Sequence, residues 1–485
     1  MATNNIGRAV IPFTIINNSG SSQPLYLYMF GTADPKKPAN NQYYLSNLQG
    51  DCERFLPNEA QKSYGLPLEG LKVEAFFPQL DGGRIYISVG NPLLVATNKD
   101  GFPDAVSADN PPPGNVNYDT IWDFVEATWH DYGDRTILNV NTTQVDAFGL
   151  AFKIEHSGFD PSNPQSPLTI VNGFDSDTAR KNIFRDLERA GTPWNQLIIR
   201  SSTAPPRPVR ALMPLKAIDQ GSFPQDQLGA YIKAVLEFYL NTTSNRLNFT
   251  YSGVNYVGQT SMGGFLFKPD KAKDDGGRET FEYKIPTPTT RQVYANSIAS
   301  SRDDGPGGAI CAALGASFCR STLTFYPNAG FPVPQNDRSL YYNNQPIFEY
   351  ARIIHSYGID NHAFCYGYDE VAGDAGGNRD VRNPTSLTLT IKGVGIMDDK
   401  LYVVNYGLTG DLTKYVGPKD RDKNPAHQVT VGPQSFATVT TQEVNGPPPW
   451  QVTQNPTGPY LTATNVESLP AVIAFDPGHL TAIAY

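Results

Sequence analysis

The chain has 485 residues, of which 39% are hydrophobic and 18% are charged. It is long enough for two or three domains with substantial cores, so disorder is excluded. A net charge of −9 and a pI near 5.2 argue against a nucleic-acid partner, whose phosphates favour basic protein faces. The 43 glycines, 40 prolines, 26 tyrosines and 25 phenylalanines favour turn-rich β structure and aromatic-lined carbohydrate sites over a helical bundle.

The beginning of the chain, MATNNIGRAVIPF, has no charged segment followed by an apolar one, so it does not read as a signal peptide. No run approaches the roughly 20 apolar residues of a membrane span. We therefore expect a soluble chain, either a mature form that follows a removed signal or a protein exported by another route. The four cysteines lack zinc-site spacing and are expected to be buried thiols.

The N-terminal part of the chain is predicted to be all β. Residues 8–16 and 24–31 read as strands around an Asn-Asn-Ser-Gly turn, and residues 82–95 read as a further pair. After a Pro- and Gly-rich loop, residues 121–129 and 136–148 read as two strands joined by the polar turn Asp-Tyr-Gly-Asp.

The middle of the chain changes to helical periodicity. Four helices are predicted, near residues 177–190, after Pro224, at 309–320 and at 345–357. Beyond Ile359 the segments HAFCYGYDE, SLTLTIKGVG and KLYVVNYGL read as strands. The simplest arrangement is a β domain built from residues 1–151 and 359–485, with 400–485 as a candidate extra β module, and an inserted α/β domain at 152–358.

Two carboxylates remain after a search for catalytic motifs. The chain has no HExxH, GxSxG, phosphate-binding or EF-hand pattern, and its six histidines include no close pair for a metal. Glu126 and Asp146 fall on the two strands of the predicted hairpin. A carboxylate set among Trp122, Phe124 and Phe148 would lose solvation, which raises its pKa towards the range of a general acid. The alternative is that Glu126 is an ordinary half-exposed strand residue with a neighbouring partner.

The segment WDFVEATW…LNVNTTQVDAFGLAF resembles the central signature of the thaumatin-like superfamily. It is more closely similar to glycoside hydrolase family 64, the laminaripentaose-producing β-1,3-glucanases. The segments GGRIYISVG, AICAAL and IFEYARIIHSYGIDNHAFCYGYDEV follow in the expected order, and the resemblance spans about residues 8–395. It implies a mainly β fold, in which a thaumatin-like β-sandwich or barrel domain and a mixed α/β domain flank a wide groove for a β-1,3-glucan chain.

The resemblance also implies roles for individual residues. Glu126 takes the general-acid position and Asp146 the general-base position of an inverting hydrolysis, whose two carboxyl groups are typically about 6.5–9.5 Å apart. His130 replaces an expected amide, which puts that sugar contact in question. The other implied substrate-binding residues are Thr128, Asn141 and Thr143 beside the pair, Asp369 pointing in from the second domain, and the stacking candidates Trp122, Tyr118, Tyr366 and Tyr368.

The expected function is therefore that of an inverting endo-type β-1,3-glucan hydrolase that releases short laminarioligosaccharides. It would be a monomer acting on laminarin- or curdlan-type polysaccharide outside the cell or in the cell wall, with no cofactor or metal. The alternative is a non-catalytic thaumatin-like protein that binds β-1,3-glucan or interacts with cell walls. The presence of both Glu126 and Asp146 favours the enzyme, because binding alone needs no acid and base. The last ninety residues, including NGPPPW at 445–450, match no segment of the family.

Overall fold

The computed structural model divides the chain into two compact units, each described by itself. The first unit contains residues 1–18 and 22–393, and the second contains residues 19–21 and 394–485. None of the helices in the described ranges has the length and apolarity needed to cross a membrane. The structure describes residues 2–36, 41–56, 62–97, 102–105, 115, 117–202, 207–240, 245–261, 263–302, 304–323, 339–371 and 379–394, and in the C-terminal part 400–405, 412–418, 427–431, 435–440, 450–453, 460–461, 472–476 and 479–484.

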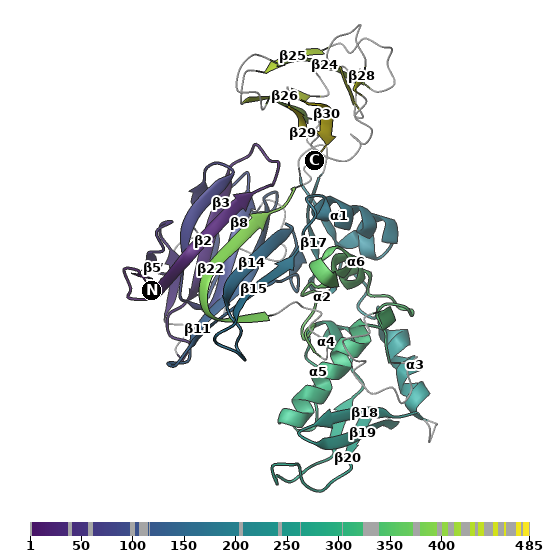
Figure 1. Ribbon diagram of the computed structural model, residues 1–485. Coiled ribbons are helices and arrows are strands. Elements are labelled where there is room, and N and C mark those ends of the chain that lie inside the picture. Colours follow the sequence, from purple (N-terminus) through teal and green to yellow (C-terminus); the bar gives the residue numbers. More distant parts are fainter. Residues whose placement is uncertain are drawn as a thin grey trace. The chain divides into compact units, whose positions relative to one another are not determined.

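A large sheet dominates the first unit (Figure 1), and 13 described strands belong to it. The main strand order is β1-β2-β22-β12-β11-β8-β3-β4-β5. Of the other four strands, β6 pairs with β3, β7 pairs with β2, and β14 pairs with β22 and with β15. Its strands are β1 (Ala2–Thr3), β2 (Ala9–Asn17), β3 (Leu25–Thr32), β4 (Gln42–Leu45), β5 (Cys52–Arg54), β6 (Leu66–Leu68), β7 (Lys72–Pro78), β8 (Asp81–Val89), β11 (Ile121–Asp131), β12 (Thr136–Thr142), β14 (Phe152–Phe159), β15 (Pro167–Gly173) and β22 (Arg379–Ile391).

Strand β11 lies inside this sheet, antiparallel to β8 on one side and to β12 on the other. The alternation of its side chains agrees with the period of two expected for a strand. Val125, Ala127 and Trp129 are fully buried, whereas Glu126 and Thr128, on the opposite face, are only partly buried. The hairpin predicted from residues 121–148 is therefore confirmed as far as Thr142, where β12 ends.

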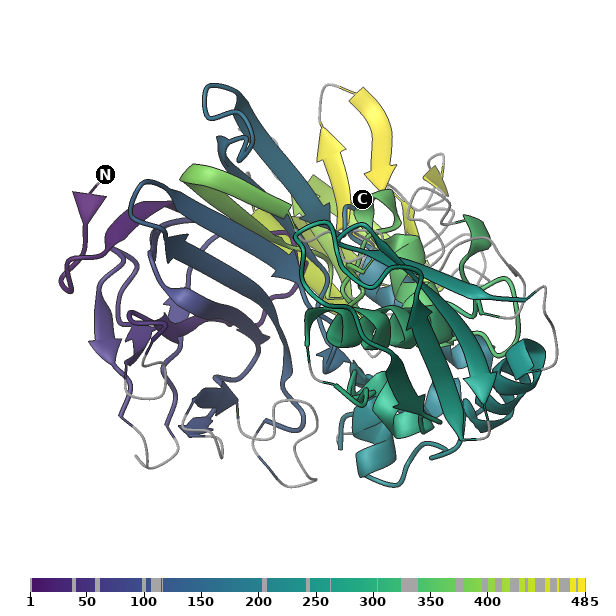
Figure 2. The ribbon, with the colours of Figure 1, turned by 90° about the horizontal axis from the view of Figure 1, so that it is seen from below.

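The other strand pairings differ from the predicted local pairs. Strand β2 pairs with β7 and runs parallel to β22, and β3 pairs with β8, so the two N-terminal strands are not partners. Strands β14 and β15 also belong to the sheet, which places residues 152–173 with the β part and not with the α/β insertion. The chain returns to the sheet through β22, which lies among the early strands (Figure 2).

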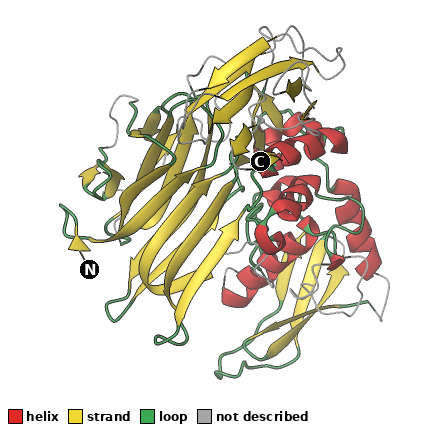
Figure 3. Cartoon of the chain, turned by 45° about the horizontal axis from the view of Figure 1, so that its top comes forward, coloured by secondary structure: helices red, strands yellow, loops and turns green. Residues whose placement is uncertain are grey.

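The helices gather beside the large sheet (Figure 3). Of the six described helices, four lie at the places that the sequence predicts, and the two short ones, at Pro214–Asp219 and Thr290–Tyr294, were not predicted. They share a core with two smaller sheets, ordered β13-β17-β16 and β18-β19-β20-β21. The helices are α1 (Ala179–Ala190), α2 (Pro214–Asp219), α3 (Gly229–Leu240), α4 (Thr290–Tyr294), α5 (Gly305–Cys319) and α6 (Glu349–Tyr357), and the strands are β13 (Ala147–Phe148), β16 (Ile198–Arg200), β17 (Pro208–Leu212), β18 (Leu247–Tyr251), β19 (Val254–Ser261), β20 (Gly264–Pro269) and β21 (Tyr283–Pro286).

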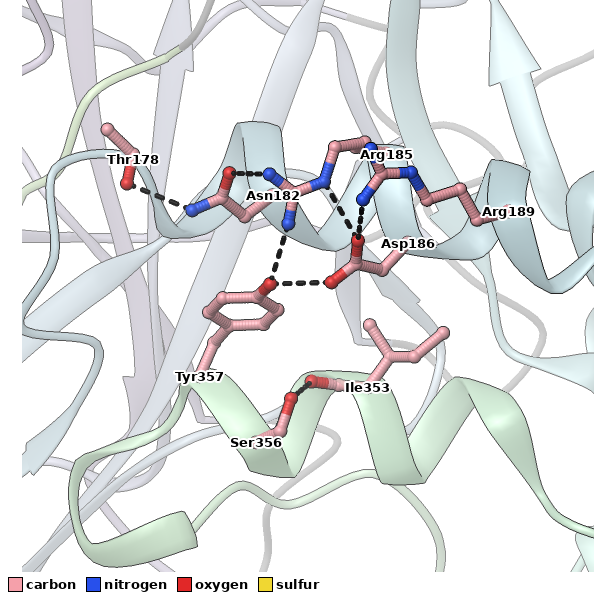
Figure 4. Close-up of polar contacts among 8 residues, drawn as sticks. All are labelled: Thr178, Asn182, Arg185, Asp186, Arg189, Ile353, Ser356 and Tyr357. Atoms are coloured by element: carbon pink, nitrogen blue, oxygen red, sulfur yellow. Dashed lines mark hydrogen bonds and ion pairs between the residues drawn. The ribbon is translucent and has the colours of Figure 1, made fainter. Parts of the chain in front are cut away.

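Polar contacts join α1 and α6, which are far apart in sequence (Figure 4). The Tyr357 hydroxyl donates to Asp186 Oδ2 at 2.5 Å and accepts from Arg185 at 3.1 Å. On the inner face of α1, Ile183 and Leu187 are fully buried. Helix α1 is thus held by an apolar face towards the core and by a tyrosine-centred network towards α6.

The segment HAFCYGYDE at 362–370 is not the strand that its aromatic content predicts. A single bridge joins Phe364 to Thr143, and the chain then turns between Tyr366 and Val371. The physical reason is Asp369, whose Oδ2 accepts the backbone N–H of Cys365 at 2.9 Å and so closes the turn. A local side-chain acceptor here replaces the ladder of a strand.

The second unit contains two described four-stranded sheets, with orders β26-β23-β29-β30 and β25-β24-β27-β28. Residues 445–449 of the Pro-rich segment lie outside the described residues. The strands are β23 (Lys400–Asn405), β24 (Leu412–Pro418), β25 (His427–Val431), β26 (Ser435–Thr440), β27 (Trp450–Thr453), β28 (Tyr460–Leu461), β29 (Val472–Asp476) and β30 (His479–Ala484).

The first unit also contains a separate two-stranded sheet, formed by β9 (Val95–Thr97) and β10 (Pro103–Ala105).

Candidate active site

Glu126 lies at the point on β11 where an aromatic cluster gives way to polar side chains. The register places Arg84 of β8 and Asn141 of β12 directly opposite it, so the three residues form a row across three strands. On the same strand, Trp122 and Phe124 are buried in a cluster with Tyr28, Phe30 and Tyr86 among others. The Glu126 side chain is 38% exposed. It is therefore set against aromatic rings on one side and remains accessible on the other.

These surroundings raise the pKa of the Glu126 carboxyl group. Burial is the largest cause, and repulsion from the Asp146 carboxylate acts in the same direction. The Arg84 guanidinium, 3.7 Å from Glu126 Oε1, opposes both effects but does not cancel them. Glu126 thus holds its proton to a higher pH than an ordinary glutamate, as a general acid must.

Asp146 lies in an irregular segment between two sheets. Strand β12 ends at Thr142, and β13 begins at Ala147 and pairs with β17, which belongs to a different sheet. The Asp146 carbonyl accepts the N–H of Met213 at 3.0 Å, and its carboxylate lies 3.1 Å from the Lys216 ammonium on α2. Strict alternation along one strand would put Asn141 and Asp146 on opposite faces, but the break after Thr142 removes that constraint.

Asp123 fixes the strand of Glu126 to the segment that follows Asp146. Its buried carboxylate accepts the N–H groups of Gly149 and Leu150, at 2.7 and 3.0 Å. A Cβ on Gly149 would lie 2.0 Å from the Trp122 carbonyl oxygen, so only glycine permits this approach. Burial raises the pKa of Asp123 to about 7, against the opposing effect of its backbone donors and of Arg210.

The site thus contains Glu126, whose pKa is raised, and a second carboxylate, Asp146, that has the Lys216 ammonium as its partner. Sequence comparison assigns the chain to a family. The sequence profile of glycoside hydrolase family 64, described as beta-1,3-glucanase, matches residues 9–391. The chain belongs to glycoside hydrolase family 64.

Solved structures of family 64 share the fold. A laminaripentaose-producing β-1,3-glucanase in complex with laminaritetraose is 23% identical over 80% of this chain and 99% of that chain, with a TM-score of 0.63. A β-1,3-glucanase domain from Clostridium beijerinckii is 20% identical over 81% of this chain and 100% of that chain, with a TM-score of 0.59. No curated protein matches the chain.

Four of the polar substrate-binding residues implied by the family 64 resemblance lie on or next to the β11–β12 hairpin. Thr128 is partly buried on the Glu126 face, and His130 on that face contacts Asp81 through Nδ1. Asn141 and Thr143 are buried, at 5% and 1% exposure. Thr128 and His130 are therefore the more accessible of the four.

The remaining implied residues divide by exposure. Tyr118 is half-buried and Tyr368 is 41% exposed. Trp122 and Tyr366 are 4% and 1% exposed, which contradicts their expected role as stacking platforms. A ring that is covered on both faces by protein cannot receive a sugar.

Asp369 does not point into a groove, contrary to expectation. Its side chain is fully buried, and Oδ2 lies 2.8 Å from His355 Nε2. The buried Arg320 donates to the Asp369 carbonyl at 2.9 Å and to the Tyr366 hydroxyl at 2.9 Å. Asp369 is thus the centre of a structural network that fixes the turn after Phe364.

This network also contains a possible ligand set for a metal, because donor atoms of His355, Cys365 and Asp369 lie within 4.8 Å of one another. One observation argues against a metal there. The Arg320 guanidinium, 4.0 Å from Asp369 Oδ1, already supplies a positive charge. Asp369 already has Arg320 and His355 as partners inside the protein.

Sequence reasoning missed three functional candidates, Arg84, Asp123 and Lys216. Arg84 lies in the family-like segment GGRIYISVG. Its spacing of two from Tyr86 on a predicted strand indicates that the two side chains share a face of the sheet. Asp123 is on the strand of Glu126, but its role depends on a segment 26 residues away in sequence. Lys216 is on a helix 70 residues beyond Asp146, and no local pattern connects the two.

Proposed function

We propose that this family 64 protein is an inverting endo-type β-1,3-glucan hydrolase that releases short laminarioligosaccharides from laminarin- or curdlan-type polysaccharide. Glu126 is the general acid and Asp146 the general base. The observation that carries the proposal is the contrast between the two carboxyl groups. Burial and a neighbouring negative charge favour the proton on Glu126, while Asp146 faces the Lys216 ammonium.

In this mechanism Glu126 donates its proton to the glycosidic oxygen as the bond breaks. Asp146 accepts a proton from the water that attacks the anomeric carbon from the opposite side, which inverts its configuration. Arg84 stabilises the carboxylate that forms on Glu126, from 3.7 Å in the resting state. Each carboxyl group therefore has a cation beside it for the part of the cycle in which it is negative.

The substrate side of the proposal rests on family membership and on the accessible polar face around Glu126. A solved relative with the same fold is described as bound to laminaritetraose. We assign contacts with sugar hydroxyls to Thr128, with Tyr118 and Tyr368 as stacking candidates and His130 as a further contact. The thaumatin-like class of the β part and a wide groove beside it belong to the same proposal.

The alternative function is glucan binding without cleavage. Substitution of the acid separates the two functions, because Glu126→Gln removes the transferable proton and keeps the shape of the side chain. We expect hydrolysis of laminarin to fall by roughly 10² to 10⁴ with laminarin binding retained. The matched control is Glu237→Gln, at a side chain on α3 that is 65% exposed, with activity unchanged. If the wild-type protein releases no oligosaccharide from laminarin or curdlan, the enzyme proposal fails and the binding function remains.

A further inference from the structure

The segment that carries Asp146 has no strand ladder to hold it. Strands β12 and β13 leave residues 143–146 between them, so the backbone groups of these residues need other partners. A single bridge joins Thr143 to Phe364, and the N–H of Gln144 donates to the Phe364 carbonyl at 2.7 Å. The position of the proposed base therefore depends on a few individual contacts.

One of these contacts comes from a tyrosine on α6. The Tyr350 hydroxyl donates to the Gln144 carbonyl at 2.7 Å, across 206 positions of sequence. The Tyr350 side chain is fully buried, so it cannot touch a substrate. Burial raises the pKa of Tyr350 well above its usual range, and the negative charge of Asp146 acts in the same direction. The hydroxyl therefore remains a hydrogen-bond donor throughout the pH range of an enzyme assay.

The side chains of the segment itself give no comparable support. Thr143 Oγ1 and Gln144 Oε1 are buried and have no hydrogen-bond partner among the described residues. At the other end of the segment, the Asp146 carbonyl accepts the Met213 N–H and its carboxylate contacts Lys216. Tyr350 thus supplies a side-chain hydrogen bond to the backbone only two residues before the base.

The two carboxyl groups are consequently held by different parts of the first unit. Glu126 lies within the large sheet, between β8 and β12. The segment of Asp146 is held instead by α2, by α6 and by the chain that follows α6. Helix α6 is itself fixed to α1, because the Tyr357 hydroxyl donates to Asp186 (Figure 4). The placement of the base relative to the acid therefore depends on α6.

We propose that Tyr350 is a positioning residue for the general base: its hydroxyl fixes the backbone at Gln144 and so sets where the Asp146 carboxylate meets the attacking water. The proposal rests on the function proposed above for Glu126 and Asp146. A displacement of about 1 Å at a reacting group can cost roughly 100-fold in rate, so one buried hydrogen bond is enough to affect catalysis.

Tyr350→Phe tests the proposal, because it removes the hydroxyl and keeps the ring. We expect kcat on laminarihexaose to fall about tenfold with KM changed less than about twofold, since no sugar contact is lost. We expect the same fall on laminaritetraosyl β-fluoride. Fluoride departs without a proton from the acid, but its replacement still needs the water that the base activates. Glu126→Gln, by contrast, should retain much more activity on the fluoride than on the hexaose.

Tyr239→Phe on α3 is the matched control. The Tyr239 hydroxyl is also buried and also donates to a backbone carbonyl, that of Leu323. Both substitutions delete one buried hydrogen bond of the same kind, but Tyr239→Phe should leave kcat unchanged on both substrates. Combination with Lys216→Met gives a second measurement. Because Tyr350 and Lys216 both place Asp146, their losses in kcat should be less than multiplicative.

The proposal is overturned if Tyr350→Phe keeps the wild-type kcat, loses activity on the hexaose alone, or raises KM in step with its loss of kcat. An equal loss in Tyr239→Phe, or losses that multiply with Lys216→Met, would also overturn it, because either result indicates general loosening of the core. A Tyr350→Phe protein that is unfolded by circular dichroism would assign the hydroxyl to stability instead. If the wild-type protein cleaves neither substrate, the proposed hydrolase function fails, and the positioning role fails with it.

Discussion

Three neighbours of Glu126 determine the direction in which the pKa of its carboxyl group shifts. The aromatic cluster around Trp122 and Phe124 removes water from the carboxyl group, and Asp146 repels its negative form. Arg84 acts in the opposite direction. The balance raises the pKa of Glu126, which is the direction that the proposed general-acid role requires, and it depends on side chains from β8 and from the segment after β12.

Arg84→Met tests this balance through the pH profile. Loss of the cation raises the pKa of Glu126 further, and the general acid is active only below its pKa. The alkaline limb of kcat/KM for laminarin should therefore move to higher pH, while kcat falls because the carboxylate formed on Glu126 is less stabilised. Arg278→Met, at a side chain that is 75% exposed, is the control and should leave the limb in place. A shift of the alkaline limb to lower pH in Arg84→Met would contradict the account.

The residues that were predictable are those with a local pattern. Alternation along one strand identified Glu126 and predicted its loss of solvation. Burial of other candidates depends on distant segments that the local sequence does not reveal. Trp122 is covered through a cluster that includes Phe55, Tyr64 and Leu93, and Asp369 is enclosed by Arg320 and His355. Trp122 and Asp369 were expected to contact substrate, but both side chains are buried.

Among the elements, the β11–β12 hairpin was predictable, but the end of β12 at Thr142 was not. Residues after Thr142 continue with strand-forming types, so the sequence favours one long strand to Phe148. Tertiary pairing decides otherwise, because Thr143 bridges to Phe364 and Ala147 pairs with Leu212. The four longer helices were predictable because their apolar periodicity is local, whereas the short α2 and α4 were not predicted. Helix α5 begins earlier than expected, at Gly305, because the Asp304 side chain accepts the N–H of Gly307 and caps the first turn.

The close approach of β11 to the segment after Asp146 can be tested at Gly149. Gly149→Ala places a methyl group 2.0 Å from the Trp122 carbonyl oxygen, so the two segments must separate. We expect a loss of about 1 to 3 kcal/mol in the free energy of unfolding, measured by denaturant titration, together with a lower kcat/KM on laminarin.

The control for this substitution is Gly308→Ala in the first turns of α5, where a Cβ meets no atom within 4 Å. It should leave stability equal or slightly raised, because alanine favours the helix. A Gly149→Ala protein with wild-type stability and activity would show that the spacing between these segments is not what positions Asp146.

At the scale of the whole molecule, the β domain extends beyond the predicted boundary at residue 151, because β14 and β15 belong to the large sheet. The sequence contained a signal for this, since Phe152, Ile154 and His156 alternate with polar residues and are buried in β14. The family match ends at residue 391, next to the boundary of the first unit at Gly393. All contacts given above for Glu126 and Asp146 lie within the first unit.

A chain truncated after Gly393 should therefore fold and hydrolyse soluble laminarin within about twofold of the full-length rate, because compact units with their own core usually fold alone. Circular dichroism and a reducing-sugar assay would measure both properties. Truncated protein that is folded yet inactive would show that residues 394–485 contribute to the catalytic site.

The central claim, that Glu126 and Asp146 act as acid and base on opposite sides of the bond, is tested most directly by proton NMR of the wild-type reaction. The spectrum of laminarihexaose hydrolysis is recorded within the first minutes, before the products mutarotate. Inversion predicts that the new reducing ends appear first as the α-anomer. First appearance of the β-anomer would instead show retention, with one carboxylate acting as a nucleophile, and would contradict the assignment of Asp146 as the base.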